Sequence, residues 1–200
     1  MLKETKAFQL KQLAEKLVHL EESPLFDYRQ ANGYQPVPGE GDSNADVIFI
    51  GEAPGAMEAE TGRPFVGRAG QMLDELLRGI GLNREDVFIT NIVKDRPPEN
   101  RDPTRAEIVL YAPLLTRQIE IIQPKVIATL GRYSMVFMIR QYNLPGKRKK
   151  IGQLHGQVLK GQTNFGDIRL FPLYHPAAVF YNRSLTPILE EDFQKLARLL

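Results

Sequence analysis

Four short apolar segments, separated by stretches with helical spacing, constrain the fold of this chain more than any other feature. Each is nearly all apolar and too short for a typical helix, which indicates strands buried on both faces of a parallel sheet. Strands that alternate with helices predict such a sheet with helices on both of its faces. The sequence therefore predicts an α/β fold, with three α/β/α layers around a central, mostly parallel four-stranded sheet. The four segments are residues 45–50, 87–93, 125–130 and 168–174.

Apolar residues recur at helical spacing between and around these segments. The first such stretch is followed, up to residue 44, by a segment rich in Pro, Gly and Asn that predicts a long surface loop. A length of 200 residues suits one domain. We predict a single domain over residues 1–200, in which the N-terminal helix and loop of residues 1–44 pack on the α/β core. The predicted helices are residues 2–20, 68–78, 104–122, 132–142 and 186–200.

The composition excludes several classes of site. The chain has no cysteine, which removes disulfides, thiolate nucleophiles and cysteine-held zinc or iron–sulfur clusters. It has three histidines, too few for us to expect a metal site built on them. No apolar run approaches the ~20 residues of a membrane helix, and the N-terminal stretch lacks a secretory apolar region. We expect a monomeric intracellular protein, cytoplasmic or nucleoid-associated, whose net charge of +2 argues only weakly for a polyanionic partner.

A loop rich in glycine follows the first predicted strand. It reads GEAPGAMEAETGRPFVGRAG over residues 51–70 and leads into a predicted helix, so it can bring backbone N–H groups close to a ligand. It holds neither a GxGxxG fingerprint nor the closing Lys-Ser/Thr of a phosphate-binding loop, so a nucleotide cofactor is not supported. Ligands of such sheets bind beyond the carboxyl ends of the strands. The sequence therefore predicts a site at that edge.

Motifs at three predicted strand ends carry a family resemblance. GEAPG with the following Glu58, GRPFVGRAG, TNIVKDRPPENR (residues 90–101) and HPAA (residues 175–178) resemble family 4 uracil-DNA glycosylases, in order over about residues 44–183. The resemblance implies the uracil-DNA glycosylase fold. It also implies a monofunctional enzyme that flips deoxyuridine out of DNA, hydrolyses its N-glycosidic bond and initiates base excision repair.

Two side chains of these motifs suit recognition of a flipped uracil. Phe65 could stack on the base, although a phenylalanine at this place could equally cover the end of the sheet as a core residue. The Asn91 carboxamide could pair with N3–H and O4 of uracil and reject the amino-bearing edge of cytosine, although it could instead cap a loop. Gly51 and Ala53 complete the predicted uracil-binding set.

His175 and two glutamates are the predicted catalytic residues. The resemblance implies that His175 donates a hydrogen bond to uracil O2 as negative charge builds on the departing base. For the base that activates water, we rank Glu52 first and Glu58 second, and Asn91 could also hold the water. The assignment stays open because better-known relatives place Asp where this chain has Ala53. Glu58 could instead form only a surface ion pair with a nearby arginine, Arg63 or Arg68.

Several other side chains are candidates for DNA contacts. Basic residues would bind phosphates and make affinity fall with salt, although a basic run such as residues 147–150 is often only a solvated loop. Either Val179 or Phe180 could enter the gap left by the flipped base, and ordinary helix packing is the alternative. The predicted phosphate contacts are Arg63, Lys94, Arg96, Arg101, His155 and Arg183.

The resemblance fails at one feature. Family 4 enzymes hold a [4Fe–4S] cluster through four cysteines, and the matching positions here are Leu20, Ser23, Asp95 and Tyr111. None of these supplies a thiolate, so we predict no cluster and no cofactor. We expect packing of Leu20 and Tyr111 to hold the N-terminal loop instead.

The missing cysteines also motivate a rival function. The chain could be a non-catalytic DNA-binding or polymerase-associated scaffold derived from the same fold. Intact Glu52, Phe65, Asn91 and His175 count against this reading, because a scaffold has no evident need for all four. A metal-dependent nucleoside hydrolase is disfavoured because the chain has no Asp-rich loop.

Overall fold

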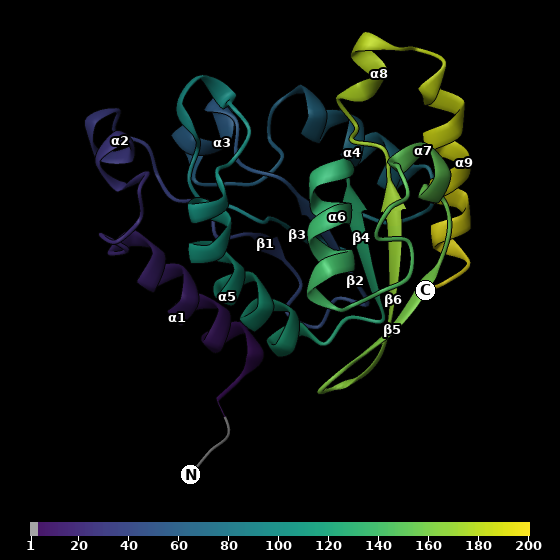
Figure 1. Cartoon of the computed structure of the whole chain (residues 1–200), viewed down its shortest axis with the longest axis horizontal. Helices are drawn as coiled ribbons and strands as arrows, with labels where there is room; N and C mark the ends of the chain where they lie inside the picture. Colours follow the sequence, from purple (N-terminus) through teal and green to yellow (C-terminus); the bar gives the residue numbers. More distant parts are fainter. Residues whose placement is uncertain (1–3) are drawn as a thin grey trace.

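The computed structural model describes residues 4–200, so Leu2 and Lys3 of the first predicted helix lie outside the described residues. Within that part the chain forms one six-stranded sheet in the order β1-β3-β2-β4-β6-β5 (Figure 1). The four inner strands are parallel, and the strand at each edge is antiparallel to its neighbour. The strands are β1 (Glu40–Gly41), β2 (Val47–Gly51), β3 (Phe88–Asn91), β4 (Val126–Leu130), β5 (Leu159–Thr163) and β6 (Gly166–Leu173).

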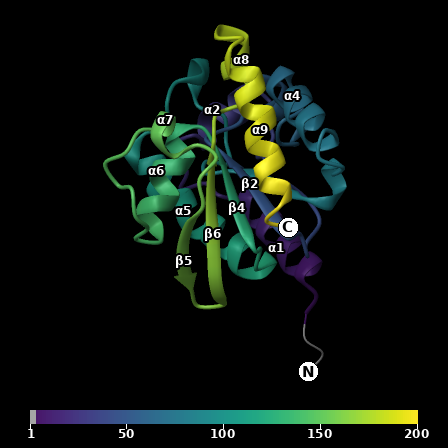
Figure 2. The ribbon, with the colours of Figure 1, turned by 90° about the vertical axis from the view of Figure 1, so that its right-hand side faces the viewer.

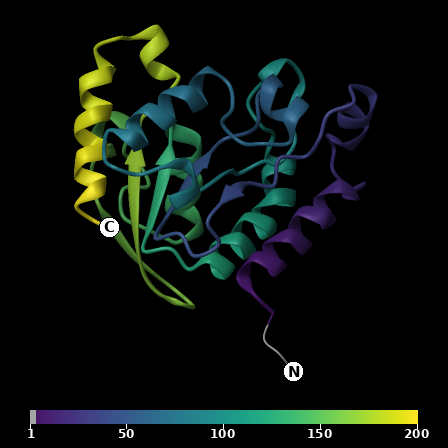
Figure 3. The same ribbon diagram turned by 180° about the vertical axis from the view of Figure 1, so that it is seen from behind.

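Helices cover both faces of the sheet, which confirms the predicted three-layer class (Figures 2 and 3). None of them, over the described residues, is long and apolar enough to cross a membrane. Two short 3-10 turns also occur, at Arg84–Asp86 and Pro98–Asn100. The α-helices are α1 (Lys6–Val18), α2 (Phe26–Ala31), α3 (Ala56–Thr61), α4 (Arg68–Arg78), α5 (Arg105–Ile122), α6 (Arg132–Gln141), α7 (Ile151–Leu154), α8 (Ala178–Tyr181) and α9 (Leu185–Ala197).

The alternation of side chains along β2 divides the core into two halves. Ile48 and Ile50 point into a cluster that includes residues of α1, α5 and α6. Val47 and Phe49 point into a second cluster with α4 and α9, where the rings of Phe49 and Phe193 stack with centroids 5.8 Å apart. A strand buried on both faces needs an apolar residue at every position, which is why the inner strands were readable as continuous apolar runs.

The two edge strands were not predicted, and their sequences explain why. β1 has only two residues within the Pro- and Gly-rich segment. Gly41 has a φ of +129°, and a Cβ there would lie 1.8 Å from the carbonyl oxygen of Val87, so only glycine permits this pairing. β5 reads LKGQT and has a single buried residue, Leu159, so it lacks the apolar signal of a strand. The prediction of four mostly parallel strands is thus correct for the inner part of the sheet, but it omits the two antiparallel edge strands.

The N-terminal segment lies against this core. α1 packs on α5, and the Lys6 ammonium donates a hydrogen bond to the carbonyl of Ile122 (2.8 Å). Further along, the backbone N–H of Gln35 donates to Ala59 and that of Val37 donates to Lys94, both at 2.7 Å. The segment is therefore hydrogen-bonded both to helix α3 and to the chain that follows β3.

Because the inner strands are parallel, their carboxyl ends meet at one edge of the sheet, the upper edge in Figure 1. β2 ends at Gly51 and β3 at Asn91, which are directly paired. β6 ends at Leu173, two residues before His175. The predicted site motifs are thus gathered at one place by the topology alone.

Candidate active site

Gly51, Asn91 and Phe65 meet at the carboxyl ends of β2 and β3. A Cβ built on Gly51 would lie 2.3 Å from Asn91 Oδ1 and 2.7 Å from Phe65 Cζ. No side chain fits there, so glycine is required for the amide and the ring to approach each other across β2. Three of the predicted uracil-binding residues are therefore brought together. The fourth, Ala53, is half-buried and packs against the core cluster that contains Ile50.

The Asn91 amide oxygen is buried without a hydrogen-bond partner among the described residues, and Asn91 is 2% exposed. Leaving such an acceptor unpaired costs about 1–3 kcal/mol. Proteins pair nearly all buried polar atoms, so an orphan at the end of a strand, beside an aromatic ring, is suited to a donor that arrives with a ligand.

Phe65 is held in place by the backbone around it. It has a φ of +51°, an uncommon conformation for a phenylalanine, and its side chain is only 6% exposed. Its carbonyl accepts a hydrogen bond from Arg84 (3.0 Å), and a Cβ on Gly70 would lie 1.7 Å from that same oxygen. The ring packs into the second core cluster and lies 5.7 Å, centroid to centroid, from the His175 ring. Phe65 is therefore both a core residue and a wall of the site.

Glu58 holds the loop that carries Phe65. Its Oε1 accepts hydrogen bonds from the backbone N–H groups of Val66 and Gly67, both at 2.9 Å. The alternative of an ion pair with Arg63 is wrong, because Arg63 instead binds Glu40 through two 2.7 Å hydrogen bonds. The Glu58 carboxylate is therefore engaged in fixing this loop and is not free of protein partners.

The His175 imidazole is neutral and its tautomer is fixed. Burial lowers the pKa of His175 to about 4, although the charge of Glu58 works in the opposite direction. The backbone N–H of Ala177 donates to Nδ1 (3.1 Å), so the ring proton is on Nε2. Gly131 leaves room for the ring, since a Cβ there would lie 3.3 Å from His175 Cβ. His175 thus presents one N–H donor at the edge of the site.

Glu52 titrates near neutral pH. It directly follows Gly51, and its backbone oxygen accepts from the N–H of Val93 (3.0 Å), which fixes the start of the loop. Burial raises the pKa of the Glu52 carboxyl to about 7; the charge of Asp102 adds to this and Arg132 opposes it. A carboxyl with this pKa can exchange a proton with water at physiological pH.

Lys94 is not a DNA contact. Its side chain is fully buried, with 0% exposure, so the prediction that it binds phosphate is wrong. Its ammonium instead donates hydrogen bonds inside the protein, and burial lowers its pKa well below the usual range. A lysine that follows an apolar strand in the sequence gives no signal of this burial.

The other predicted phosphate contacts lie at or near the surface, and most already have protein partners. Arg101 pairs with Glu107 (2.6 Å), and Arg96 donates to Tyr34 (2.6 Å). The half-buried His155 bonds to Asp192 through Nδ1 (2.7 Å). Arg183 and residues 147–150 are exposed.

The candidates for insertion into DNA need a correction. Val179 is 4% exposed and belongs to the second core cluster, so the prediction that it could enter the duplex is wrong. Phe180 is 40% exposed and packs under the Arg68 guanidinium, 4.4 Å from its ring centroid. Tyr181, which the sequence reading missed, is 91% exposed at the end of α8. Helical spacing from a buried Val179 would have pointed to it.

Three of the four positions that match cluster ligands form a buried hydrogen-bonded network. Ser23 and Tyr111 are joined through their hydroxyls (2.6 Å), and Tyr111 donates to the Asp95 carboxylate. Arg29, which the sequence reading missed, pairs with Asp95 (3.0 Å) and also donates to the carbonyl of Leu17 (3.0 Å). Oxygen ligands and a guanidinium do not fit an iron–sulfur cluster, which is held by thiolates. Over residues 4–200 no group of three metal-binding side chains occurs either.

Comparison with known proteins agrees with this geometry. The model of the uracil DNA glycosylase superfamily matches residues 38–200. The chain is 50% identical to the Type-4 uracil-DNA glycosylase of Saccharolobus solfataricus over 165 residues, 82% of this chain and 76% of that protein. It is 43% identical to the Type-4 enzyme of Sulfurisphaera tokodaii, over 95% of this chain and 84% of that protein.

A third relative, the Type-4 uracil-DNA glycosylase of Thermotoga maritima, is 44% identical over 80% of each chain. The range that the superfamily model matches includes all four motifs and the inner strands that position them. The chain therefore belongs to the uracil DNA glycosylase superfamily, and its resemblance to family 4, in a form without cysteine, is confirmed.

Proposed function

We propose that the protein excises uracil from DNA by hydrolysing the N-glycosidic bond of a flipped deoxyuridine. The observation that carries this proposal is the orphaned, buried Asn91 Oδ1 beside Gly51, which also adjoins the Phe65 ring. The names of its relatives support it, since they are uracil-DNA glycosylases of comparable length.

Recognition follows from the donor and acceptor pattern of the base. Asn91 Oδ1 accepts the N3–H of uracil, and the amide nitrogen donates to O4. Cytosine has no proton at N3 and carries an amino group at position 4. Its N3 acceptor would therefore face the acceptor Asn91 Oδ1, and its amino donor would face the donor amide nitrogen. A buried site built on such bonds discriminates strongly, because the wrong base leaves its polar groups unpaired.

Bond cleavage places a negative charge on the base. As the N1–C1′ bond breaks, its electron pair goes to N1 and the charge spreads to O2, where the His175 Nε2–H donates. Glu52 takes a proton from the water that attacks C1′, which leaves an abasic sugar and the uracil anion. The anion then takes up a proton from solvent, and Glu52 returns its own proton to solvent. Lys94 is buried and fully hydrogen-bonded, so it is not available as an amine nucleophile, which supports a monofunctional enzyme.

The test is an excision assay on oligonucleotides that carry one uracil, thymine or hypoxanthine, single-stranded and in duplex, followed by alkaline cleavage. Strand breaks at uracil support the proposal, and an equally purified Asn91→Ala protein controls for contaminating glycosylases. The rival scaffold function predicts DNA binding without breaks at any enzyme concentration, and that result would overturn the proposed activity.

The pKa of Glu52 gives a pH prediction. Only the deprotonated carboxylate can accept a proton, and its pKa is about 7, so the single-turnover rate rises with pH and levels off above that value. Below it the rate falls about tenfold for each pH unit. The Glu52→Gln variant should be slow and lack this acid limb. A wild-type profile that stays flat down to about pH 5.5 would remove Glu52 from the role of base.

We place the insertion into DNA at the tip of α8. Tyr181 is the most exposed large hydrophobic side chain among residues 4–200, and it lies six residues after His175. A ring that fills the gap left by a flipped base compensates part of the lost stacking, about 1–3 kcal/mol. Tyr181→Ala should therefore lower excision from duplex DNA about tenfold and leave single-stranded excision unchanged. Phe8→Ala, an exposed aromatic on α1, is the control, and equal losses on both substrates would contradict this placement.

We further propose that the protein works without an iron–sulfur cluster or other resident cofactor. The support is the absence of cysteine from the sequence and the hydrogen-bonded network of Ser23, Asp95 and Tyr111 at the matching positions. Elemental analysis of the purified active protein tests this, and iron in stoichiometric amount would overturn it.

A further inference from the structure

Lys94 is a fully buried lysine that binds the backbone of Asn91, the residue proposed to read uracil. It lies three residues after Asn91, and its side chain has 0% exposure. Among the described residues, no carboxylate lies within ion-pair distance of its nitrogen. A buried cation without a counter-ion is costly and rare, so its retention calls for an explanation.

Three oxygen acceptors surround the Lys94 nitrogen. Nζ donates to Thr90 Oγ1 (2.6 Å), to the backbone oxygen of Asn91 (2.8 Å) and to Gln118 Oε1 (2.7 Å). Each of these contacts is short, and they come from β3, its last residue and α5. The nitrogen therefore joins the end of β3 to the helix packed against it.

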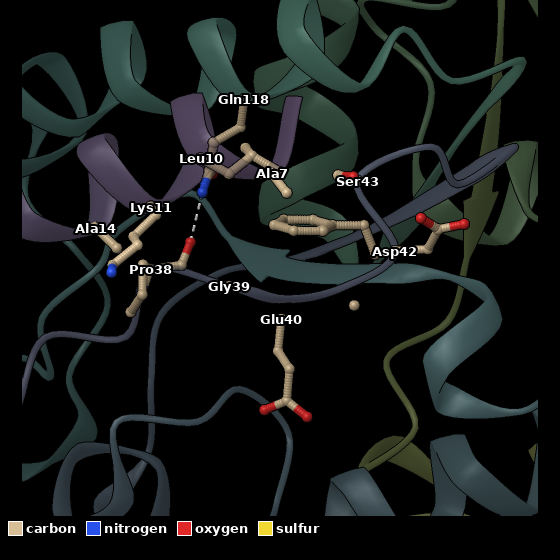
Figure 4. A pocket seen from close by; sticks show the side chains of 12 residues that line it. Ala7, Leu10, Lys11, Ala14, Pro38, Gly39, Glu40, Asp42, Ser43 and Gln118 are labelled. Atoms are coloured by element: carbon tan, nitrogen blue, oxygen red, sulfur yellow. Dashed lines mark hydrogen bonds between the residues drawn. The ribbon is translucent and has the colours of Figure 1, made fainter. Parts of the chain in front are cut away.

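The orientation of these groups shows which form of the amine they bind. Gln118 Nε2 donates to the carbonyl of Pro38 (2.6 Å), a bond drawn in Figure 4, so Oε1 must face Lys94. Thr90 Oγ1 donates its own proton to that same carbonyl (3.0 Å), which leaves a lone pair toward Lys94. Three lone pairs match the three N–H bonds of an ammonium, whereas a neutral amine would turn its own lone pair toward one of them. These three acceptors therefore favour the ammonium and oppose the effect of burial, which lowers the pKa of Lys94.

We propose that Lys94 is a positioning residue for base excision: its ammonium fixes the backbone of Asn91 and places a positive charge behind the departing uracil. This inference rests on the proposed function. The ammonium touches no substrate, because it is enclosed by protein, and acts through the residue whose side chain reads the base. Its charge favours the anion that forms as the bond breaks more than the neutral base, so it accelerates the chemical step rather than binding.

The test uses two leaving groups and single-turnover kinetics. In Lys94→Met, which is similar in size and uncharged, excision of uracil should fall about 10- to 100-fold, less than for loss of a direct donor. The affinity for uracil-containing DNA should change little. With 5-fluorouracil, whose anion is more stable, the loss should be several-fold smaller, because a better leaving group depends less on the charge. A merely structural role would reduce both rates by the same factor.

Gln118→Glu keeps the acceptor for Lys94 and supplies a counter-charge, while it loses the Nε2 donor to the Pro38 carbonyl. It therefore tests the charge in a protein whose core is filled. It should reproduce the smaller loss on 5-fluorouracil, even where Lys94→Met fails to fold. If the wild type excises uracil and Gln118→Glu loses the same factor on both bases, this inference is overturned and the proposed function is not. A wild type that excises no uracil would overturn the proposed function, and this inference with it.

Discussion

His175→Ala should lower the single-turnover rate of uracil release by about 10²- to 10³-fold, the cost of removing one preorganised donor from a developing anion. The reason is the state in which the fold holds this ring. Burial keeps its pKa near 4, and the Ala177 N–H occupies Nδ1, so the remaining proton points from Nε2 and is present at every physiological pH. The affinity for uracil-containing DNA should fall much less than the rate, because the charge appears only as the bond breaks.

The controls separate the donor from the ring. His175→Gln retains an N–H and should recover part of the rate, and His19→Ala, on the exposed end of α1, should have no effect. Since a neutral donor does not titrate above its pKa of about 4, the wild-type rate should show no alkaline decline near neutral pH. A decline centred near the ordinary histidine pKa of about 6.5 would show that the imidazolium is the active form.

The site was predictable where sequence spacing alone determines geometry. Parallel strands end at one edge, so Gly51, Asn91 and His175 had to converge there once the strands were recognised. The glycines were informative for the same reason: Gly51 permits an approach that any Cβ would block.

What could not be predicted depends on partners far away in the sequence. By its sequence context Lys94 resembles a surface lysine, because the Gln118 side chain that binds its ammonium lies 24 residues later in the chain. Arg29 reaches Asp95 across 66 residues, and no local pattern marks a buried arginine in a polar loop. In both cases the donor is buried because an acceptor from a distant segment binds it. The sequence around the donor does not show that acceptor, so the burial could not be predicted.

Arg29→Met should lower the free energy of unfolding by about 3–5 kcal/mol, as expected when one partner of a buried ion pair is removed. Arg29 is 3% exposed and Asp95 is 1% exposed, so the remaining carboxylate cannot be solvated. Burial already raises the pKa of Asp95, and Arg29 and Tyr111 oppose that effect. Without the arginine, the folded state must take up a proton that the unfolded state releases, so the loss of stability should grow as pH rises. Urea denaturation at two pH values measures it.

Two further variants distinguish the buried charge from the loss of a large side chain. Arg29→Met combined with Asp95→Leu removes both charges and should recover a large part of the stability. Lys125→Met breaks an ion pair with Asp46 that is shorter (2.7 Å) but has partners 55% and 49% exposed, and it should cost less than about 1 kcal/mol. Arg29 also donates to the carbonyls of Leu17 and Val18, so it joins the end of α1 to the segment after β3. If Arg29→Met were as stable as wild type, the N-terminal segment would have to be held by its apolar contacts alone, and the network could not be the element that joins it to the core.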